Sequence, residues 1–141
     1  MREFSLTGFA HFLGSVAVTR AADHEALERA AVIVETEAKR VISTYDYNWP
    51  QLAPSTQADR VAQGFPANEP LLRTGEMRDS IEHVSDRKEA QIGSNSDIAV
   101  WQELGTVSIP ARSFLGEAAI RKEQEVVDEI GRVVVSTLLL P

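Results

Sequence analysis

The stretch VWQELGTVSIPARSFL, residues 100–115, joins the end of a predicted helix to a segment that leads back to the core. An apolar helical pattern over Asp97–Leu104 stops at Gly105, where helices commonly end on a left-handed residue. Pro110 fixes its own φ and holds the preceding residue extended, so a stiff connector is predicted. The connector is predicted to deliver Phe114 and Leu115 to the core. We interpret the stretch as a rigid elbow rather than as the lip of a catalytic pocket.

Three polar or aromatic side chains stand beside this elbow. Glu103 precedes the break and Arg112 follows it, so we expect an ion pair that fixes the elbow. Such pairs are more often structural than catalytic. Trp101 is predicted to lie in the core or in an interface, because an indole favours burial with its N–H at a polar edge.

Two long helices are predicted on either side of the centre. The first runs from Asp23 to about Tyr45, and apolar residues at steps of four and three form one stripe. The last helix runs from Leu115 to about Leu138, and Gly131 within it costs about 1 kcal/mol relative to alanine. The predicted stripe of this last helix contains Ile120, Val127, Ile130, Val134 and Leu138.

Short strands are predicted between the helices. Residues 81–85 and 89–93 form a hairpin, in which Ile81, His83 and Ser85 share one face. A weakly alternating opening strand is expected over residues 3–9, and a short helix follows Leu71. This order of elements mixes helices and antiparallel strands.

Residues 46–70 break the pattern with four prolines and a glycine, which predicts an extended loop. Loops of this length in compact domains are often functional. The segment carries Tyr47, Trp49 and Phe65, which a free loop would rarely expose to water. Two alternatives stay open at this point: the loop folds back on its own core, or it is an arm that docks on a neighbouring subunit.

The overall composition limits the function. A length of 141 residues favours a single domain over residues 1–141. The net charge of −7 argues against a nucleic-acid-binding protein, because phosphate binding needs a cluster of positively charged side chains. Cysteine is absent, no histidine pair has the spacing of a metal site, and no apolar run reaches the ~20 residues of a membrane span. No cofactor or metal is therefore expected.

Three motifs resemble those of tailed-phage virion-morphogenesis proteins, the small neck, tail-completion or head–tail joining components. They are LLRTGEMRDSI, AQIGSNSDIAVWQELGT and IPARSFLGEAAI, in order between Leu71 and Ile120. Ser113 stands where the family often has proline, and AVWQELGT departs from its usual Tyr-Ala. The residues that match are Thr74, Gly75, Met77, Arg78, Ser80, Ile81, Ile92, Gly93, Ser94, Glu103, Gly105, Thr106, Pro110, Ala111, Arg112, Phe114 and Leu115.

The resemblance implies an α+β fold with a small, mainly antiparallel β-sheet packed against two long α-helices. It also implies a non-catalytic structural subunit of a homo-oligomeric ring, a hexamer, in the virion neck or tail terminus after assembly in the host cytoplasm. Its partners would be other neck and tail proteins, and DNA would pass through an acidic lumen without specific binding.

Two alternatives from other functional classes remain open. One is a tail-assembly chaperone of the same fold that leaves the finished particle. The other is a small metal-dependent hydrolase that would use Glu103, Arg112 and His83.

Overall fold

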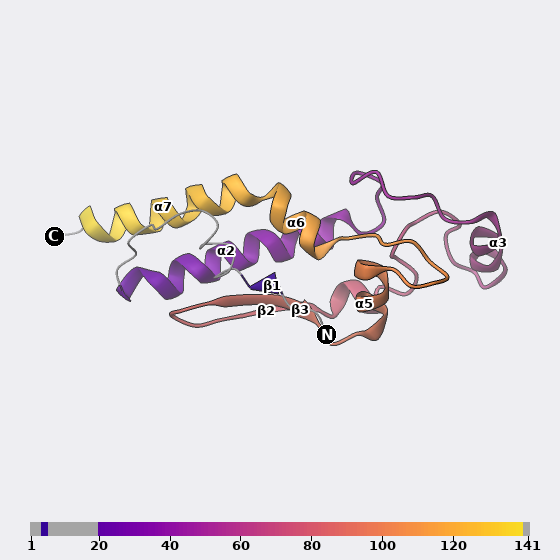
Figure 1. The fold of residues 1–141 in the computed structure, drawn as a ribbon, viewed down its shortest axis with the longest axis horizontal. Helices are drawn as coiled ribbons and strands as arrows, with labels where there is room; N and C mark the ends of the chain where they lie inside the picture. The colour runs from indigo at the N-terminus through magenta and orange to yellow at the C-terminus, as the bar shows by residue number, and fades with distance from the viewer. Residues whose placement is uncertain (1–3, 6–19, 140–141) are drawn as a thin grey trace.

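The computed structural model describes residues 4–5 and 20–139, and Figure 1 shows an elongated molecule. Two helices and a hairpin run along its length, and α3 lies at the end opposite the C-terminus. The elements in chain order are β1 (Phe4–Ser5), α2 (Arg20–Val41), α3 (Pro54–Ala62), α4 (Glu76–Asp79), β2 (Ile81–Ser85), β3 (Ala90–Ser94), α5 (Asp97–Leu104), α6 (Leu115–Arg121) and α7 (Glu123–Leu139).

The sheet is antiparallel with the order β1-β3-β2, so the predicted α+β class is confirmed. In the hairpin His83 pairs with Ile92, and the strand β3 begins one residue later than predicted. Ile81 is buried on the face that packs against α2, whereas Val84 points to the exposed face. Of the predicted opening strand, β1 forms at Phe4–Ser5, and residues 6–9 lie outside the described residues.

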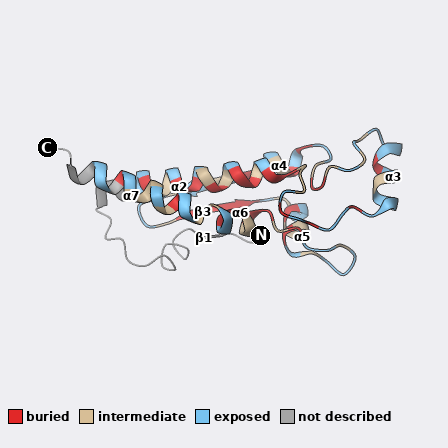
Figure 2. Cartoon of the chain, turned by 90° about the horizontal axis from the view of Figure 1, so that it is seen from above, coloured by how far each residue is buried: buried red, intermediate tan, exposed pale blue. Residues whose placement is uncertain are grey.

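The helix α2 presents a stripe of small side chains to the core, as the period of its sequence predicts. Ala31 and Ala38 are fully buried and alternate with the larger Val34 and Val41, which lets neighbouring elements approach closely. Figure 2 shows this stripe as a repeating buried face along the helix. The helix α7 packs lengthwise on α2, and Arg29 Nη1 lies 3.1 Å from Glu129 Oε1 across their contact.

The predicted continuous last helix is instead divided at Lys122 into α6 and α7. Both pieces pack on α2, and the bend between them keeps each in contact with it. Ile120 was expected on the buried stripe, but it is 62% exposed, because the residues of α6 that face the core are Leu115, Ala118 and Ala119. Gly131 lies inside α7 and not at the break.

The segment 46–70 is not a loop throughout, because α3 occupies its middle. Pro54 stands in the first turn of α3, where a missing N–H costs no hydrogen bond. Tyr47 and Trp49 are buried in the chain's own core, with their rings edge to face at 5.6 Å. The prediction that these two aromatic residues dock on a neighbouring subunit is therefore wrong, and the fold-back alternative is confirmed.

Candidate functional site

The elbow between α5 and α6 is held by the buried carboxylate of Glu103. Its Oε1 accepts hydrogen bonds from Ser113 Oγ at 2.7 Å and Gly116 N at 3.1 Å. Its Oε2 accepts from the backbone N–H groups of Phe114 at 2.8 Å and Leu115 at 3.0 Å. A negative charge here satisfies donors that have no partner inside α6 and lies at the positive end of the helix dipole.

Arg112 does not pair with Glu103, and the predicted ion pair is wrong. Both oxygens of Glu103 are used by the start of α6, and Arg112 turns to a different segment. Its Nε and Nη2 donate to Pro50 O at 3.0 and 2.8 Å, and Nη2 also donates to Gln51 O at 3.1 Å. Burial lowers the pKa of Arg112. The indole of Trp49 adds a bond to Ser113 O at 3.2 Å, so two distant segments are joined at the elbow.

The turn that follows α5 is closed and rigid. Gly105 has a φ of +73°, and a Cβ there would lie 2.7 Å from the backbone nitrogen of Ala111, so glycine is required. Its ψ of 169° differs from the left-handed helical value that the sequence predicted. Thr106 N donates to Ile109 O at 2.9 Å, and Thr106 Oγ1 accepts from the N–H of Ser108 at 3.1 Å.

An apolar surface lies beside this turn. Ile98, Trp101 and Leu104 follow one another at steps of three on α5, and their exposed fractions are 51%, 51% and 46%. Ala99 and Glu103 form the buried side of the same helix. We call Ile98, Trp101 and Leu104 the α5 stripe. The exposure of Trp101 excludes the core alternative, and its place in an interface stays a prediction.

Val107 continues the apolar surface at the tip of the turn, where its side chain is fully exposed. Pro110 is also exposed in the connector, whereas Phe114 is completely buried, as the sequence predicts. The elbow thus separates a surface that faces water from an anchor in the core.

The first motif forms the junction between α4 and the sheet. Gly75 has a φ of +92° immediately before α4, and Thr74 Oγ1 accepts from the N–H of Glu76 at 3.3 Å. Ser80 Oγ lies 2.6 Å from Ser94 Oγ, which joins the end of α4 to β3. The remaining motif residues are Arg78, whose Nε contacts Asp79 at 3.3 Å near the surface, and Gly93, which is buried in β3.

A cleft of about 590 Å³ opens between α3, the start of α4 and α5. Arg60 forms part of its wall and is itself buried, and Nη1 donates to Glu69 O at 3.0 Å and to Leu72 O. Burial lowers the pKa of Arg60. Gln102 also lines the cleft, and its buried Oε1 has no hydrogen-bond partner among the described residues.

Phe65 from the predicted docking arm is half-buried on its own chain. The guanidinium of Arg73 lies over its ring, 4.9 Å from the centroid. Phe65 therefore packs within the subunit at the margin of the segment that α3 occupies, and it does not extend from the molecule as a separate arm.

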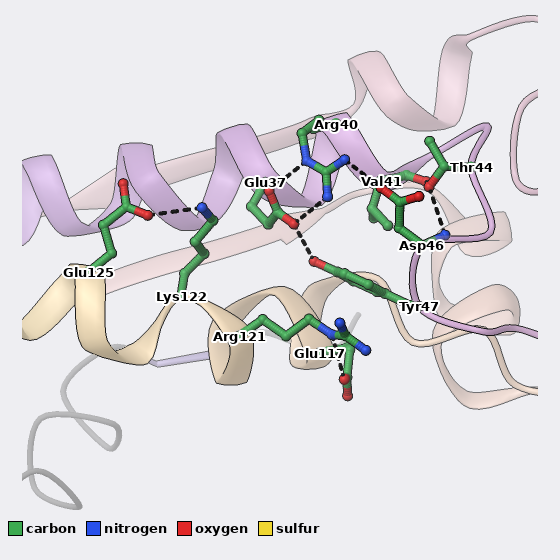
Figure 3. A network of polar contacts seen from close by, with 10 residues as sticks. All are labelled: Glu37, Arg40, Val41, Thr44, Asp46, Tyr47, Glu117, Arg121, Lys122 and Glu125. Carbon is green, nitrogen blue, oxygen red and sulfur yellow. Dashed lines mark hydrogen bonds and ion pairs between the residues drawn. The ribbon is translucent and has the colours of Figure 1, made fainter.

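A polar network joins α2 to the start of the segment 46–70 (Figure 3). The buried Glu37 accepts two hydrogen bonds from Arg40, each of 2.8 Å, and one from Tyr47 Oη at 2.8 Å. Arg40 also reaches Asp46 at 2.8 Å, and Arg121 lies over the Tyr47 ring at 4.3 Å. The bonds from Arg40 lower the pKa of Glu37 to about 2 although burial opposes this, and burial raises the pKa of Tyr47. Glu37 is therefore a buried and paired carboxylate, not one on a solvated face of α2.

The structure places the residues of the hydrolase alternative in separate networks. Glu103 and Arg112 bond to different backbone segments, whereas the ring nitrogens of His83 face Glu28 and Glu35 on α2. In the part of the chain whose side chains are described, no group of three His, Asp or Glu side chains has the geometry of a metal site.

Sequence reasoning missed the buried roles of Glu37 and Arg60. The spacing of Glu37 and Arg40 by three residues in a helix is a signal for a local pair, but it does not reveal burial. Nothing in the sequence around Arg60 indicates which carbonyl groups it would meet, because both acceptors come from a later turn.

Comparison of the chain with protein-family models, with curated proteins and with solved structures yields no match. In the described part of the chain, none of the helices combines the length and the apolar character that a membrane span requires. A functional proposal therefore depends on the sequence motifs and on the geometry of the elbow.

Proposed function

We propose that this protein is a structural subunit of a ring in a phage neck or tail terminus, where it joins or completes the head–tail connection without catalysis. The ring is a hexamer whose partners are other neck and tail proteins of the virion. The ordered motifs between Leu71 and Ile120 support this assignment. The observation that carries it is the exposed α5 stripe, which lies directly beside the rigid elbow.

The α5 stripe has the chemistry of a subunit contact. A half-exposed tryptophan next to exposed isoleucine and leucine is typical of interfaces, in which aromatic residues supply much of the binding energy. Val107 extends the same apolar character along the neighbouring turn. In the proposed ring, a second copy of the chain covers this surface.

The elbow gives this surface a fixed shape before assembly. Glu103 ties α5 to the start of α6, and Arg112 ties the connector to residues 50–51. A surface that is already ordered loses less conformational entropy when it binds, so binding is stronger for the same contact area. The charged side chains of the elbow thus hold backbone segments in place by hydrogen bonds, which supports a structural role over the hydrolase alternative.

The acidic composition agrees with passage of DNA through a lumen. A net charge of −7 gives a surface that repels phosphate and offers few of the cation contacts that retain DNA. DNA would slide through such a ring without specific binding.

The proposal is tested by light scattering after size-exclusion chromatography over a range of protein concentrations. We expect a ring-sized mass for the wild type and its loss in the double variant Trp101→Ser, Leu104→Ser. Ile120→Ser is a matched control, because Ile120 is equally apolar and 62% exposed but lies on α6. Equal masses for both variants would reject the α5 stripe as the contact.

Mass spectrometry of purified particles tests the place of the protein. Its presence in stoichiometric amounts is expected for a neck or tail-terminus subunit. Its absence from finished particles, together with a monomeric wild type, would reject the structural proposal in favour of the assembly chaperone.

A further inference from the structure

The inner face of β2 carries a histidine that two acidic side chains of α2 enclose. His83 Nε2 lies 2.9 Å from Glu28 Oε1, and Nδ1 contacts Glu35 Oε2. The two glutamates are seven residues apart, which places them on the same face of the helix two turns from each other. The imidazole is only 19% exposed, so the contact is partly shielded from water.

This geometry needs the charged form of the ring. An ionised carboxylate only accepts hydrogen bonds, and both ring nitrogens donate only in the imidazolium. Loss of the proton would turn one nitrogen lone pair toward a carboxylate oxygen. The neutral ring therefore loses one of its two bonds and meets electrostatic repulsion in its place.

Neighbouring charges balance the cluster. Lys39 Nζ lies 2.6 Å from Glu35 Oε1, and the hydroxyl of Ser85 donates to Glu28. His24 lies near enough to Glu28 to act on it electrostatically. In this cluster the two anions Glu28 and Glu35 thus meet the cations His83 and Lys39.

These contacts shift the pKa of each of the three groups toward its charged form. Burial opposes charging of His83, but the hydrogen bonds with Glu35 and Glu28 outweigh it and raise the pKa of His83. The bond from Ser85 lowers the pKa of Glu28, with His83 adding to the effect. Burial raises the pKa of Glu35, but the bonds from His83 and Lys39 prevail and lower it.

The cluster lies where weaker hydrogen bonds at His83 would affect the attachment of the β2–β3 hairpin to α2. In the order β1-β3-β2, the strand β2 has a sheet neighbour only on one side among the described residues. The hairpin extends along α2 in Figure 1, and α2 packs against its inner face, where His83 lies. Stronger or weaker bonds at His83 therefore change how firmly the hairpin holds to the helix.

We propose that Glu28, Glu35 and His83 form a pH-sensitive clamp, which holds the β2–β3 hairpin on α2 while the imidazole is charged and loosens it when the proton leaves. Since His83 has a raised pKa in the folded state and the pKa values of Glu28 and Glu35 are lowered, the stabilisation is fully present between about pH 4.5 and 6.5. It is lost as the pH rises through the folded-state pKa. This property does not depend on the proposed ring.

Nuclear magnetic resonance of the wild-type protein tests the clamp directly. Nitrogen shifts of the His83 ring report the protonation of Nδ1 and Nε2 from pH 5 to 9. We expect both nitrogens to carry protons past pH 6.5 and the midpoint to fall in Glu35→Gln. A midpoint at or below about 6.5 in the wild type would overturn the proposal.

Amide hydrogen exchange measures the consequence for the hairpin. Protection of the β2 and β3 amides should fall above the His83 midpoint, by about tenfold for each unit by which the folded pKa exceeds that of the opened hairpin. His83→Gln should abolish this extra pH dependence, whereas Glu125→Gln, which removes the charge of an exposed carboxylate on α7, should retain it. Protection with the same pH profile in all three proteins would overturn the clamp, and the wild-type titration decides the matter if His83→Gln does not fold.

Discussion

The two ends of this molecule are stabilised by different kinds of interaction. The body, formed by α2, α7 and the β2–β3 hairpin, buries small apolar side chains such as Ala31, Ala38 and Ile92 in a continuous layer. The elbow end, formed by residues 46–72 and 97–116, shares this layer through Trp49 and Phe114. It relies in addition on buried Glu103, which bonds to the start of α6, and on buried Arg112, which bonds to the backbone of residues 50–51.

This difference determines how each end should respond to change. Apolar packing is distributed over many contacts, so a shortened side chain removes a part of the stabilisation. A buried polar network concentrates stabilisation in a few bonds, and loss of one partner leaves the others unsatisfied in a place without water. The elbow end should therefore be the more sensitive to single substitutions.

The largest effect is expected at Glu103. Glu103→Ala should lower the free energy of unfolding by about 3 kcal/mol, because buried N–H groups at the start of α6 lose their acceptor. Urea denaturation measures the change. Glu125→Ala is the control, since that carboxylate is 57% exposed and forms a surface ion pair with Lys122. Equal, small losses in both variants would break the contrast between the ends.

An intermediate effect is expected from acid at Glu37, which joins the two ends. Its folded pKa of about 2 lies below the ordinary value of 4.5, so its contribution is present above pH 4.5 and is lost as the pH falls toward 2. We expect the contribution to be about 2 kcal/mol after allowance for the half-exposed Arg40.

The contribution of the Glu37 carboxylate is isolated by comparing the free energy of unfolding of the wild type with that of Glu37→Gln between pH 2 and 7. The stability difference between them should shrink as the pH falls below 4.5. A difference that stays constant over this range would show that the carboxylate charge does not hold Tyr47 and the following segment on α2.

The smallest effect is expected in the body. Ile92→Val removes one buried methyl group from the centre of β3 and should cost about 1 kcal/mol, because the surrounding layer retains its other contacts. Thermal and urea unfolding measure the loss. A cost as large as that of Glu103→Ala would mean that the body is packed as rigidly as the elbow and that the proposed contrast is wrong.

The body was largely predictable from the sequence, and the elbow end only in outline. The apolar steps of α2 and the alternation of residues 81–85 are local patterns, and the structure reproduces them within a few residues at their boundaries. The break at Gly105 was predicted from its helix-ending chemistry. The partners of Glu103 and Arg112 were not predicted, because a sequence shows that two charged residues are close in the chain but not which donors or acceptors of the folded backbone lie nearest to each.

The burial of Tyr47 and Trp49 shows the same limit. Because both side chains are aromatic, the sequence indicated that they are buried, and either the chain's own core or a second subunit could bury them. The choice depended on where Pro50 and Gln51 would meet Arg112, which is a contact between residues about sixty positions apart. The break between α6 and α7 lies at Lys122 and not at Gly131.

The sequence by itself determined the helical and strand periods, the acidic surface and the position of the elbow, since each depends on the chemistry of residues close together in the chain. Only the tertiary structure decided that Glu103 caps α6, that Arg112 binds residues 50–51, and that Trp101 faces outward. The physical reason is that a buried polar group takes whichever partner the folded backbone brings within hydrogen-bonding distance, and local periodicity carries no information about that distance.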